Sequence, residues 1–168
     1  TLIARRIDPT ATAVLSVTRI QGGTSHNALP GEVQLAGSVR TFDTAVQDKL
    51  EAILHEWVEL TAKAAGCTAS VEYRRLYPAT INDPACAQHA LDAASALFGQ
   101  ALRADSPAAT GEDFAFMLQQ VPGAYIWVGS RKGDHSPSLH HPSFDFNDEA
   151  LPAGAALLAS LAERRLAA

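Results

Sequence analysis

The sequence predicts a mixed α/β protein built from two successive parts. Three observations support this: stretches in which apolar and polar residues alternate, stretches in which apolar residues recur every three or four positions, and a turn-rich segment between two such regions. Alternation is typical of strands with one buried face, and the longer period is typical of amphipathic helices. The turn-rich segment, Tyr77 to Asp83, divides the 168 residues into residues 1–77 and residues 78–168.

Two strands are predicted near the start of the chain. Thr12 to Ile20 is apolar and β-branched, which favours a strand, and the turn-rich Gln21 to Gly31 follows it. From Glu32 to Phe42 the sequence alternates between apolar and polar residues. This second segment therefore predicts a strand with one buried face.

A helix and a third strand are predicted next. The helix begins at Thr44, which has the capping-box spacing with Gln47, and it ends at Gly66. Cys67 to Leu76 alternates again and predicts the third strand. The first part therefore predicts a portion of an α+β sandwich with a helix on one face of the sheet. The predicted buried stripe of the helix consists of Val46, Leu50, Ile53, Leu54, Trp57, Leu60 and Ala64.

The second part begins with a well-marked helix. Asp83 is a typical N-cap before Pro84, and Gly99 ends the helix. A short helix is predicted to start near Thr110. Ala124 to Val128 is wholly apolar, which predicts a strand buried on both faces.

A polar loop and a last helix complete the second part. The loop extends from Arg131 to Phe146, and Asp148 is predicted to cap a helix with Pro152 in its first turn. The predicted buried residues of the first and last helices of this part are Ala87, Leu91, Ala94, Leu97 and Phe98, and Leu151, Ala155, Leu158 and Leu161.

Composition and charge exclude several classes of protein. Hydrophobic residues make up 47% of the chain and charged residues 18%, which excludes a disordered or fibrous chain. The net charge is −5 and the basic residues are scattered, which disfavours a nucleic-acid partner. No apolar run reaches the ~20 residues that a membrane helix needs, and no signal peptide is visible.

The cysteines and the first residue bear on location and completeness. Cys67 and Cys86 match no metal-ligand spacing, and a disulfide between them is possible but not indicated. We therefore expect a reduced, cytoplasmic protein. The chain opens at Thr1 rather than at a methionine, so we expect a processed, truncated or fragmentary chain.

Metal-ligand side chains concentrate in one stretch near the end of the chain. Imidazoles and carboxylates together suit zinc, manganese and similar ions. By composition alone the signal is weak, because a loop histidine is more often solvated or structural. The candidate ligands are Asp134, His135, His140, His141, Asp145 and Asp148.

Two further groups of residues have both a functional and a plain structural interpretation. Arg40 lies on the polar side of its predicted strand, and Asn27 lies in the turn before it; a guanidinium and an amide can together hold a carboxylate. The plain alternative is a turn asparagine and an exposed strand arginine. Glu112 and Asp113 precede the short helix, where negative charge is favourable whatever the function.

Four segments in fixed order resemble the C-terminal half of the aminoacylase and hippurate hydrolase family of binuclear metal amidohydrolases. Together they span nearly the whole chain, and their order and spacing are far more specific than any single motif. The segments are GGTSHNALPGEVQLAGSVRTFD, EYRRLYPATIND, GEDFAFMLQQVPGAYIWVG and LHHPSFDFNDEAL, at residues 22–43, 72–83, 111–129 and 139–151.

The resemblance implies roles for four residues. His140 matches the metal-ligand histidine of the family's L-H-x-P motif, and Glu112 of the G-E-D-F motif would lie beside the metal cleft and support its geometry. Asn27 and Arg40 match the pair that binds the substrate carboxylate. His141 occupies the variable place after the ligand.

The resemblance also implies a fold. Residues 1–77 would be the C-terminal part of a ferredoxin-like β-α-β lid and dimerisation domain. Residues 78–168 would be the C-terminal part of a zinc-peptidase-like α/β catalytic domain.

Several family features are missing from this sequence. The remaining ligands (a cysteine, two histidines and a glutamate) and the glutamate general base belong to the N-terminal half of the family, so no catalytic residue is expected here. The lid histidine of the G-x-G-G-H motif is absent too, and His26 stands where an aromatic residue is common. We expect the isolated chain to bind no metal stably.

The implied activity is metal-dependent hydrolysis of N-acyl amino acids, such as hippurate, or of related small amides and peptides. The whole enzyme would use two divalent ions (Zn, Mn, Co or Ni) to activate water. It would take a small-molecule N-acyl amino acid as substrate and form a homodimer through the lid. The alternative is a catalytically silent binding or dimerisation module with the same fold.

Overall fold

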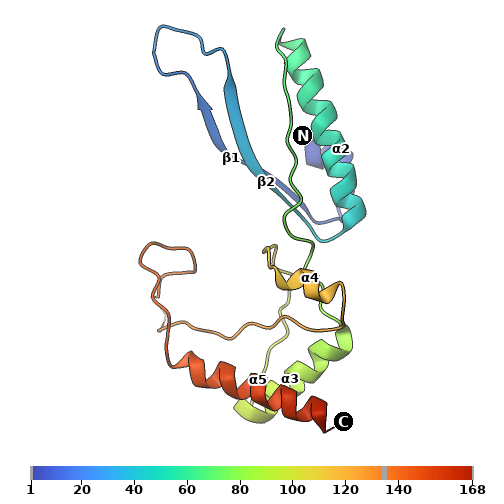
Figure 1. Ribbon diagram of the computed structural model, residues 1–168, viewed down its shortest axis with the longest axis vertical. Coiled ribbons are helices and arrows are strands. Elements are labelled where there is room, and N and C mark those ends of the chain that lie inside the picture. Colours follow the sequence, from blue (N-terminus) through green and yellow to red (C-terminus); the bar gives the residue numbers. More distant parts are fainter. Residues whose placement is uncertain (1, 134–135, 168) are drawn as a thin grey trace. The chain divides into compact units, whose positions relative to one another are not determined.

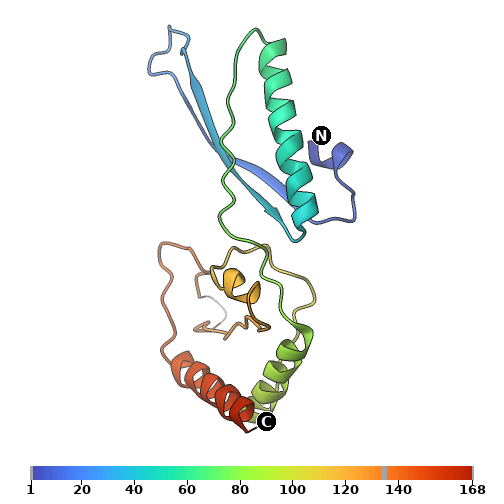
Figure 2. The same ribbon diagram turned by 45° about the vertical axis from the view of Figure 1, so that its right-hand side comes forward.

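The computed structural model describes residues 2–133 and 136–167. It contains helices and one two-stranded antiparallel sheet, so the predicted mixed α/β class is confirmed. The chain forms two compact units (Figures 1 and 2). Unit 1 comprises Thr1–Ile81 and Ala108–Phe116, and unit 2 comprises Asn82–Pro107 and Met117–Ala168.

The sheet of unit 1 is a long hairpin of β1 (Ala13–Gly22) and β2 (Val33–Thr41). A register shift between Val17 and Arg19 marks a β-bulge in β1. Because of the bulge, Ile20 rather than Arg19 pairs opposite Leu35, which keeps the apolar side chains on one face.

A glycine makes the close approach of the two strands possible at the bulge. Gly37 is the register partner of Val17, and a Cβ built on Gly37 would lie 2.1 Å from the carbonyl oxygen of Ser16. No side chain fits at that distance, so the pairing of the hairpin depends on glycine at this position.

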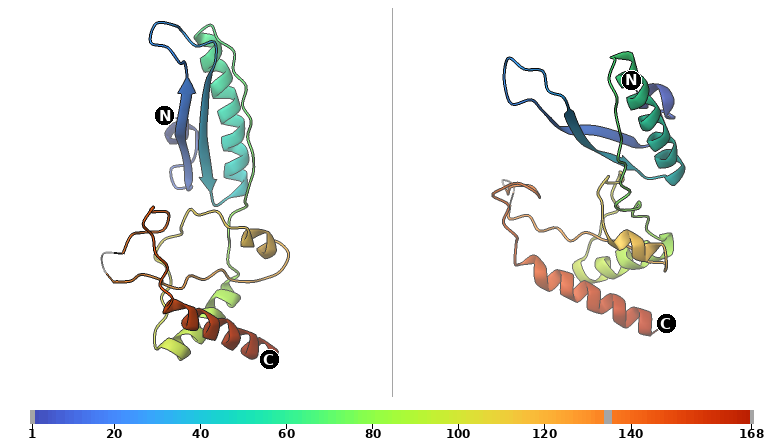
Figure 3. Two further views of the ribbon diagram at one scale, coloured as in Figure 1. Left: turned by 60° about the vertical axis from the view of Figure 1, so that its left-hand side comes forward. Right: turned by 45° about the horizontal axis from the view of Figure 1, so that its top comes forward.

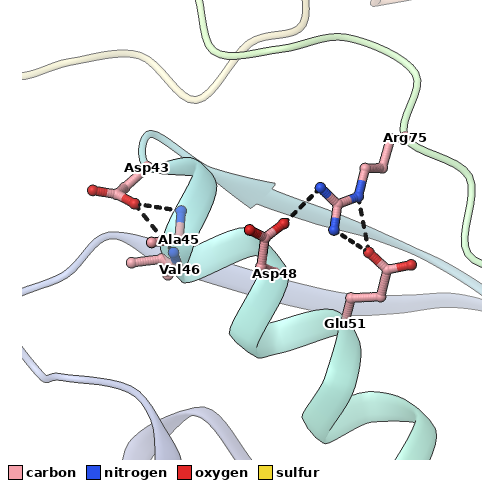
Figure 4. A network of polar contacts seen from close by, with 6 residues as sticks. All are labelled: Asp43, Ala45, Val46, Asp48, Glu51 and Arg75. Carbon is pink, nitrogen blue, oxygen red and sulfur yellow. Dashed lines mark hydrogen bonds and ion pairs between the residues drawn. The ribbon is translucent and has the colours of Figure 1, made fainter.

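Helix α2 (Thr44–Ala64) follows the hairpin and packs on β2 (Figure 3). The predicted capping box of Thr44 and Gln47 is wrong by one residue. Asp43 is the N-cap, and its carboxylate accepts hydrogen bonds from the backbone N–H groups of Ala45 and Val46 (Figure 4). A carboxylate also interacts favourably with the positive end of the helix dipole.

The core of unit 1 lies at the open end of the hairpin. A short helix that the sequence did not predict, α1 (Leu2–Arg6), leads into Ile7, which packs with Leu50 and Ile53 of α2. Leu50 is 0% exposed. The predicted stripe is therefore confirmed at its centre and wrong towards the C-terminal end, where Trp57 and Leu60 are exposed.

The predicted third strand, Cys67 to Leu76, is not a strand in the structure. Val71 and Tyr73 are half-buried and Glu72 and Arg74 exposed, so burial alternates as predicted, but the backbone joins no ladder. The segment is attached to α2 by Arg75.

The guanidinium of Arg75 forms ion pairs with Asp48 and Glu51 (Figure 4). Its Nε donates to a Glu51 carboxylate oxygen at 2.8 Å. These contacts hold the segment against the helix without making it a strand.

Unit 2 contains α3 (Pro84–Phe98) and α5 (Ala150–Leu166), which pack on each other. The start and end predicted for α3 are confirmed: the Asp83 carboxylate accepts from the N–H of Cys86 at 2.9 Å, and Gly99 is left-handed with φ 77°. The N-cap of α5 is Glu149 rather than Asp148, and its side chain makes no capping bond.

The buried positions of these helices differ from the prediction. Small residues, Ala90 and Ala93, are buried on α3, and Leu157 is buried on α5. Four large residues of the predicted stripes are exposed instead: Leu97, Phe98, Leu151 and Leu158. Alanines allow close approach on α3, and on α5 one large side chain, Leu157, is buried.

The predicted buried strand Ala124 to Val128 is not a strand either, and Trp127 is 64% exposed. Asn82 acts as its hydrogen-bonding partner: the backbone N–H of Tyr125 donates to Asn82 Oδ1 at 2.8 Å, and Asn82 Nδ2 donates to the Tyr125 carbonyl at 3.0 Å. One side-chain amide can bond the backbone N–H and carbonyl of a single residue, so Asn82 cannot replace a neighbouring strand.

The remaining helix, α4 (Phe114–Leu118), begins at Phe114 rather than near Thr110. Among the described residues, no helix is long and apolar enough to span a bilayer.

Candidate functional site

Arg40 lies near the open end of the hairpin, where its strand position pairs with Val14. The side chain is exposed, and its Nη1 donates to the backbone carbonyl of Ala109 at 2.5 Å. A guanidinium has five N–H donors in a planar fork. Arg40 can therefore keep this bond and still offer donors to an anionic ligand.

The Arg40 contact brings β2 to the segment that carries Glu112. Both Ala109 and Glu112 belong to the stretch Ala108–Phe116, which is part of unit 1. Glu112 is half-buried, and its backbone carbonyl accepts from Ala115 at the start of α4. The structure thus brings two of the predicted site residues, Arg40 and Glu112, into one neighbourhood of the fold.

Aromatic packing holds this segment in place. A Cβ on Gly111 would lie 3.3 Å from the ring of Tyr77, so the backbone passes close to that ring. The Tyr77 and Phe116 rings lie with centroids 6.2 Å apart and tilted by 59°, a geometry typical of stabilising aromatic pairs. The sequence analysis did not predict this role of Tyr77, although Tyr77 lies in the segment EYRRLYPATIND, directly before Pro78.

Asn27 lies at the other end of the hairpin, in the exposed loop between Gly22 and Val33. Its Oδ1 accepts from the Ser25 hydroxyl at 2.5 Å. Val33 and Arg40 are seven steps apart along an extended strand, which corresponds to roughly 23 Å. Within one chain, the structure does not bring Asn27 beside Arg40.

His140 is exposed and has a left-handed backbone, with φ 69°. In the part of the chain that the structure describes, it is the only non-glycine residue with positive φ. For a residue with a Cβ this conformation costs roughly 1–2 kcal/mol. Such strain concentrates at functional sites, so the observation draws attention to His140 independently of any motif.

Other candidate ligands of the loop have structural roles or lie outside the described residues. Lys132 Nζ lies 2.7 Å from Asp145 Oδ2, and this bond lowers the pKa of the Asp145 carboxyl. The Asp148 carbonyl accepts from Leu151 in the first turn of α5. Asp134 and His135 lie outside the residues that the structure describes.

The donor chemistry of this chain fits one ligand of a metal centre. The exposed imidazole of His140 is a suitable ligand for divalent transition metals. Across residues 2–133 and 136–167, no three His, Cys, Asp or Glu side chains come together to complete a site. The described residues therefore fit one position of a metal centre and do not supply the rest.

The cysteines add no ligand group. Both are free; Cys67 is exposed and Cys86 is half-buried. A hydrogen bond with the Asp83 carboxylate raises the pKa of the Cys86 thiol, which disfavours the thiolate form that binds metals.

A cavity of about 450 Å³ lies in unit 1 between α2 and residues 67–71. Its lining includes His55, Glu59 and Lys63 from successive turns of α2. None of the predicted site residues lines it.

Comparison with known proteins places these observations in a family. The model of peptidase family M20/M25/M40 matches residues 5–164. The chain belongs to this family. The resemblance to a family of metal amidohydrolases inferred from the four segments is therefore confirmed.

Two curated relatives of this M20 chain are named as a deacetylase and as a hydrolase. An N-acetyl-L-cysteine deacetylase of Bacillus subtilis is 32% identical over 99% of the chain and 39% of the relative. The IAA-amino acid hydrolase ILR1-like 4 of Arabidopsis thaliana is also 32% identical, over 98% of the chain and 39% of the relative. The M20 chain thus spans about two fifths of the length of these relatives.

A solved M20 structure shares the fold. The YXEP protein of Bacillus subtilis, described as a dinuclear metal binding peptidase, superposes with a TM-score of 0.73 at 29% identity. The similarity covers 96% of this chain and 43% of that protein.

Proposed function

We propose that this chain is part of a metal-dependent amidohydrolase that hydrolyses the amide bond of N-acyl amino acids. The match to the M20 family over residues 5–164 carries the proposal. Relatives named as a deacetylase of N-acetyl-L-cysteine and as an amino acid conjugate hydrolase support an amino acid with an acylated nitrogen as the substrate class.

Arg40 is the proposed carboxylate-binding residue. Two parallel N–H bonds from a guanidinium to a carboxylate combine charge with a fixed orientation. Because Ala109 accepts one of its N–H groups, the Arg40 side chain is held towards the segment that carries Glu112. This would hold the carboxylate end of the substrate at Arg40.

His140 is the proposed ligand of one of two divalent ions, of the kind Zn, Mn, Co or Ni. A divalent ion supplies Lewis-acid polarisation of the scissile carbonyl. Glu112 would support the geometry of that cleft. The other ligands and the general base would come from polypeptide that this chain does not include, so the chain alone is proposed to be inactive.

Uncovered apolar surface supports a larger enzyme around this chain. The chain has 17.7 kDa and exposes 13075 Å², whereas two compact domains of half that mass would together expose roughly 9,600 Å². Ile20 and Leu35 on the apolar face of the hairpin are 68% and 63% exposed. Surfaces of this kind are normally covered by further protein.

The separation of Asn27 from Arg40 supports the proposed homodimer through unit 1. One carboxylate cannot span roughly 23 Å of strand. Asn27 of a second copy could instead complement Arg40 of the first. The shared site would then require two copies of the lid.

The test is hydrolysis by the full-length enzyme of an N-acetyl amino acid and of the matching carboxamide. We expect the free acid to be cleaved and the carboxamide to be cleaved at least about tenfold more slowly, because it lacks the charge that Arg40 binds. Removal of divalent metal by a chelator should abolish both reactions, and their return on adding Mn²⁺ or Zn²⁺ is the control.

Failure to cleave any N-acyl amino acid with metal present would contradict the proposed activity. That result, together with a stable dimer, would favour the alternative of a silent binding or dimerisation module.

A further inference from the structure

His141 is engaged through three of its polar atoms. Its backbone N–H donates to the Ser138 carbonyl at 3.1 Å, and its own carbonyl accepts from the N–H of Phe144 at 2.9 Å. The ring atom Nδ1 accepts from the N–H of Ser143 at 3.0 Å. Two consecutive turns therefore meet at this residue, which composition alone had marked only as a candidate ligand.

The first of these turns contains the strained residue. In the turn from Ser138 to His141, His140 holds the third position with φ 69°, and Leu139 has no positive φ. This is the pattern of a type II turn, in which glycine or asparagine normally takes the third position. His140 lacks the conformational freedom of glycine, so bonds from neighbouring residues help to hold the turn.

The second turn supplies these bonds. Pro142 has a fixed φ and no N–H, and it restricts His141 to extended backbone. The ring of His141 then reaches past the proline to the N–H of Ser143. This is the bond that asparagine and aspartate side chains make to the backbone two residues on.

We propose that His141 is a positioning residue for His140. Its Nδ1 locks the second turn, which keeps the first turn closed and orients the His140 imidazole for metal binding. The proposal rests on the proposed role of His140 as a metal ligand. Because Nδ1 accepts from Ser143, the ring proton lies on Nε2 and Nδ1 is not available as a ligand.

Three variants of the full-length enzyme test this role. Both His141→Leu and His141→Ala remove the Nδ1 acceptor. Leucine keeps a large side chain at this position, and alanine does not. His141→Asn offers Oδ1 near the position of Nδ1 and forms the same type of turn. His55→Leu, on the exposed side of α2, is the matched control for loss of a histidine.

The measurement is the dissociation constant of Zn²⁺ from the metal-free enzyme, by competition with a chelator. We expect His141→Leu and His141→Ala to raise it about tenfold, as loss of groups that orient ligands does. His141→Asn and His55→Leu should stay near wild type. When Zn²⁺ is saturating, KM should change little in all four variants. The value of kcat should fall in His141→Leu and His141→Ala and stay near wild type in His141→Asn and His55→Leu.

Two results would overturn the proposal: Zn²⁺ affinity unchanged in both His141→Leu and His141→Ala, or equal weakening in His141→Asn. His140→Ala, measured in the same series, separates the two levels of inference. If it leaves Zn²⁺ affinity unchanged, the proposed ligand itself is wrong. If it abolishes tight binding while the His141 variants bind normally, only the positioning role is wrong.

Discussion

Replacing His140 by alanine in the full-length enzyme is expected to lower its metal content and its activity together. Loss of groups that merely orient a ligand costs 10–100-fold in metal affinity or activity, so loss of the ligand itself should cost more than about a hundredfold. The measurement is metal per protein after dialysis, alongside the rate of N-acyl amino acid hydrolysis.

The control for His140→Ala is His55→Ala, an exposed histidine on α2 that lies outside the proposed site. It should leave both quantities unchanged. An unaltered metal content and rate in His140→Ala would remove His140 from the metal centre. The left-handed backbone at this position would then need another explanation.

Replacing Arg40 by alanine is expected to reduce kcat/KM for N-acyl amino acids about ten- to a hundredfold. This corresponds to roughly 1.5–3 kcal/mol for a charge-assisted contact with the substrate carboxylate. Lysine at the same position should restore only part of the loss, because it keeps the charge and loses the planar fork.

The matching carboxamide substrates distinguish loss of substrate binding from loss of local structure in Arg40→Ala. Arg40 also donates to Ala109, so its removal could simply loosen the segment near Glu112. In that case both substrates would slow equally. Substrate recognition instead predicts that wild type handles the carboxamide poorly and that Arg40→Ala adds little. Arg74→Ala, an exposed arginine that pairs with Glu72, serves as the control.

Local chemistry explains what could be predicted of the fold. Asp83, Pro84 and Gly99 mark the ends of α3 by bonds and dihedral angles that involve only near neighbours. The two strands of the hairpin were likewise predicted, the first from an apolar, β-branched segment and the second from an alternating one after a turn. The bulge was not, because it depends on the close approach of Gly37 to β1.

The two missing strands have a common physical reason. The pattern of apolar residues shows how a segment can be buried, by alternation in residues 67–76 and by a wholly apolar run at residues 124–128. A strand also needs a neighbouring strand to which its backbone can hydrogen-bond, and the pattern does not show one. In the part of the chain that the structure describes, only β1 and β2 pair. Exposure of Trp127 fits a segment suited to a strand partner that residues 2–133 and 136–167 do not provide.

The candidate site was predicted only in part, for a similar reason. Motif matching named four residues, Asn27, Arg40, Glu112 and His140, but it carries no information on the distances between them. The separation of Asn27 from Arg40 became visible only in the register of the hairpin. The strained turn at His140 carries no glycine or asparagine, so no turn rule could have found it.

The most direct test of the central claim compares the 168-residue chain with the full-length enzyme. Release of the amino acid from an N-acetyl amino acid is measured for both, with Mn²⁺ or Zn²⁺ present and after chelation. The account predicts metal-dependent turnover by the full-length enzyme and none by the chain alone, because His140 is the one metal ligand proposed here and no three potential ligands come together among the described residues. Metal-dependent turnover by the purified chain would contradict it.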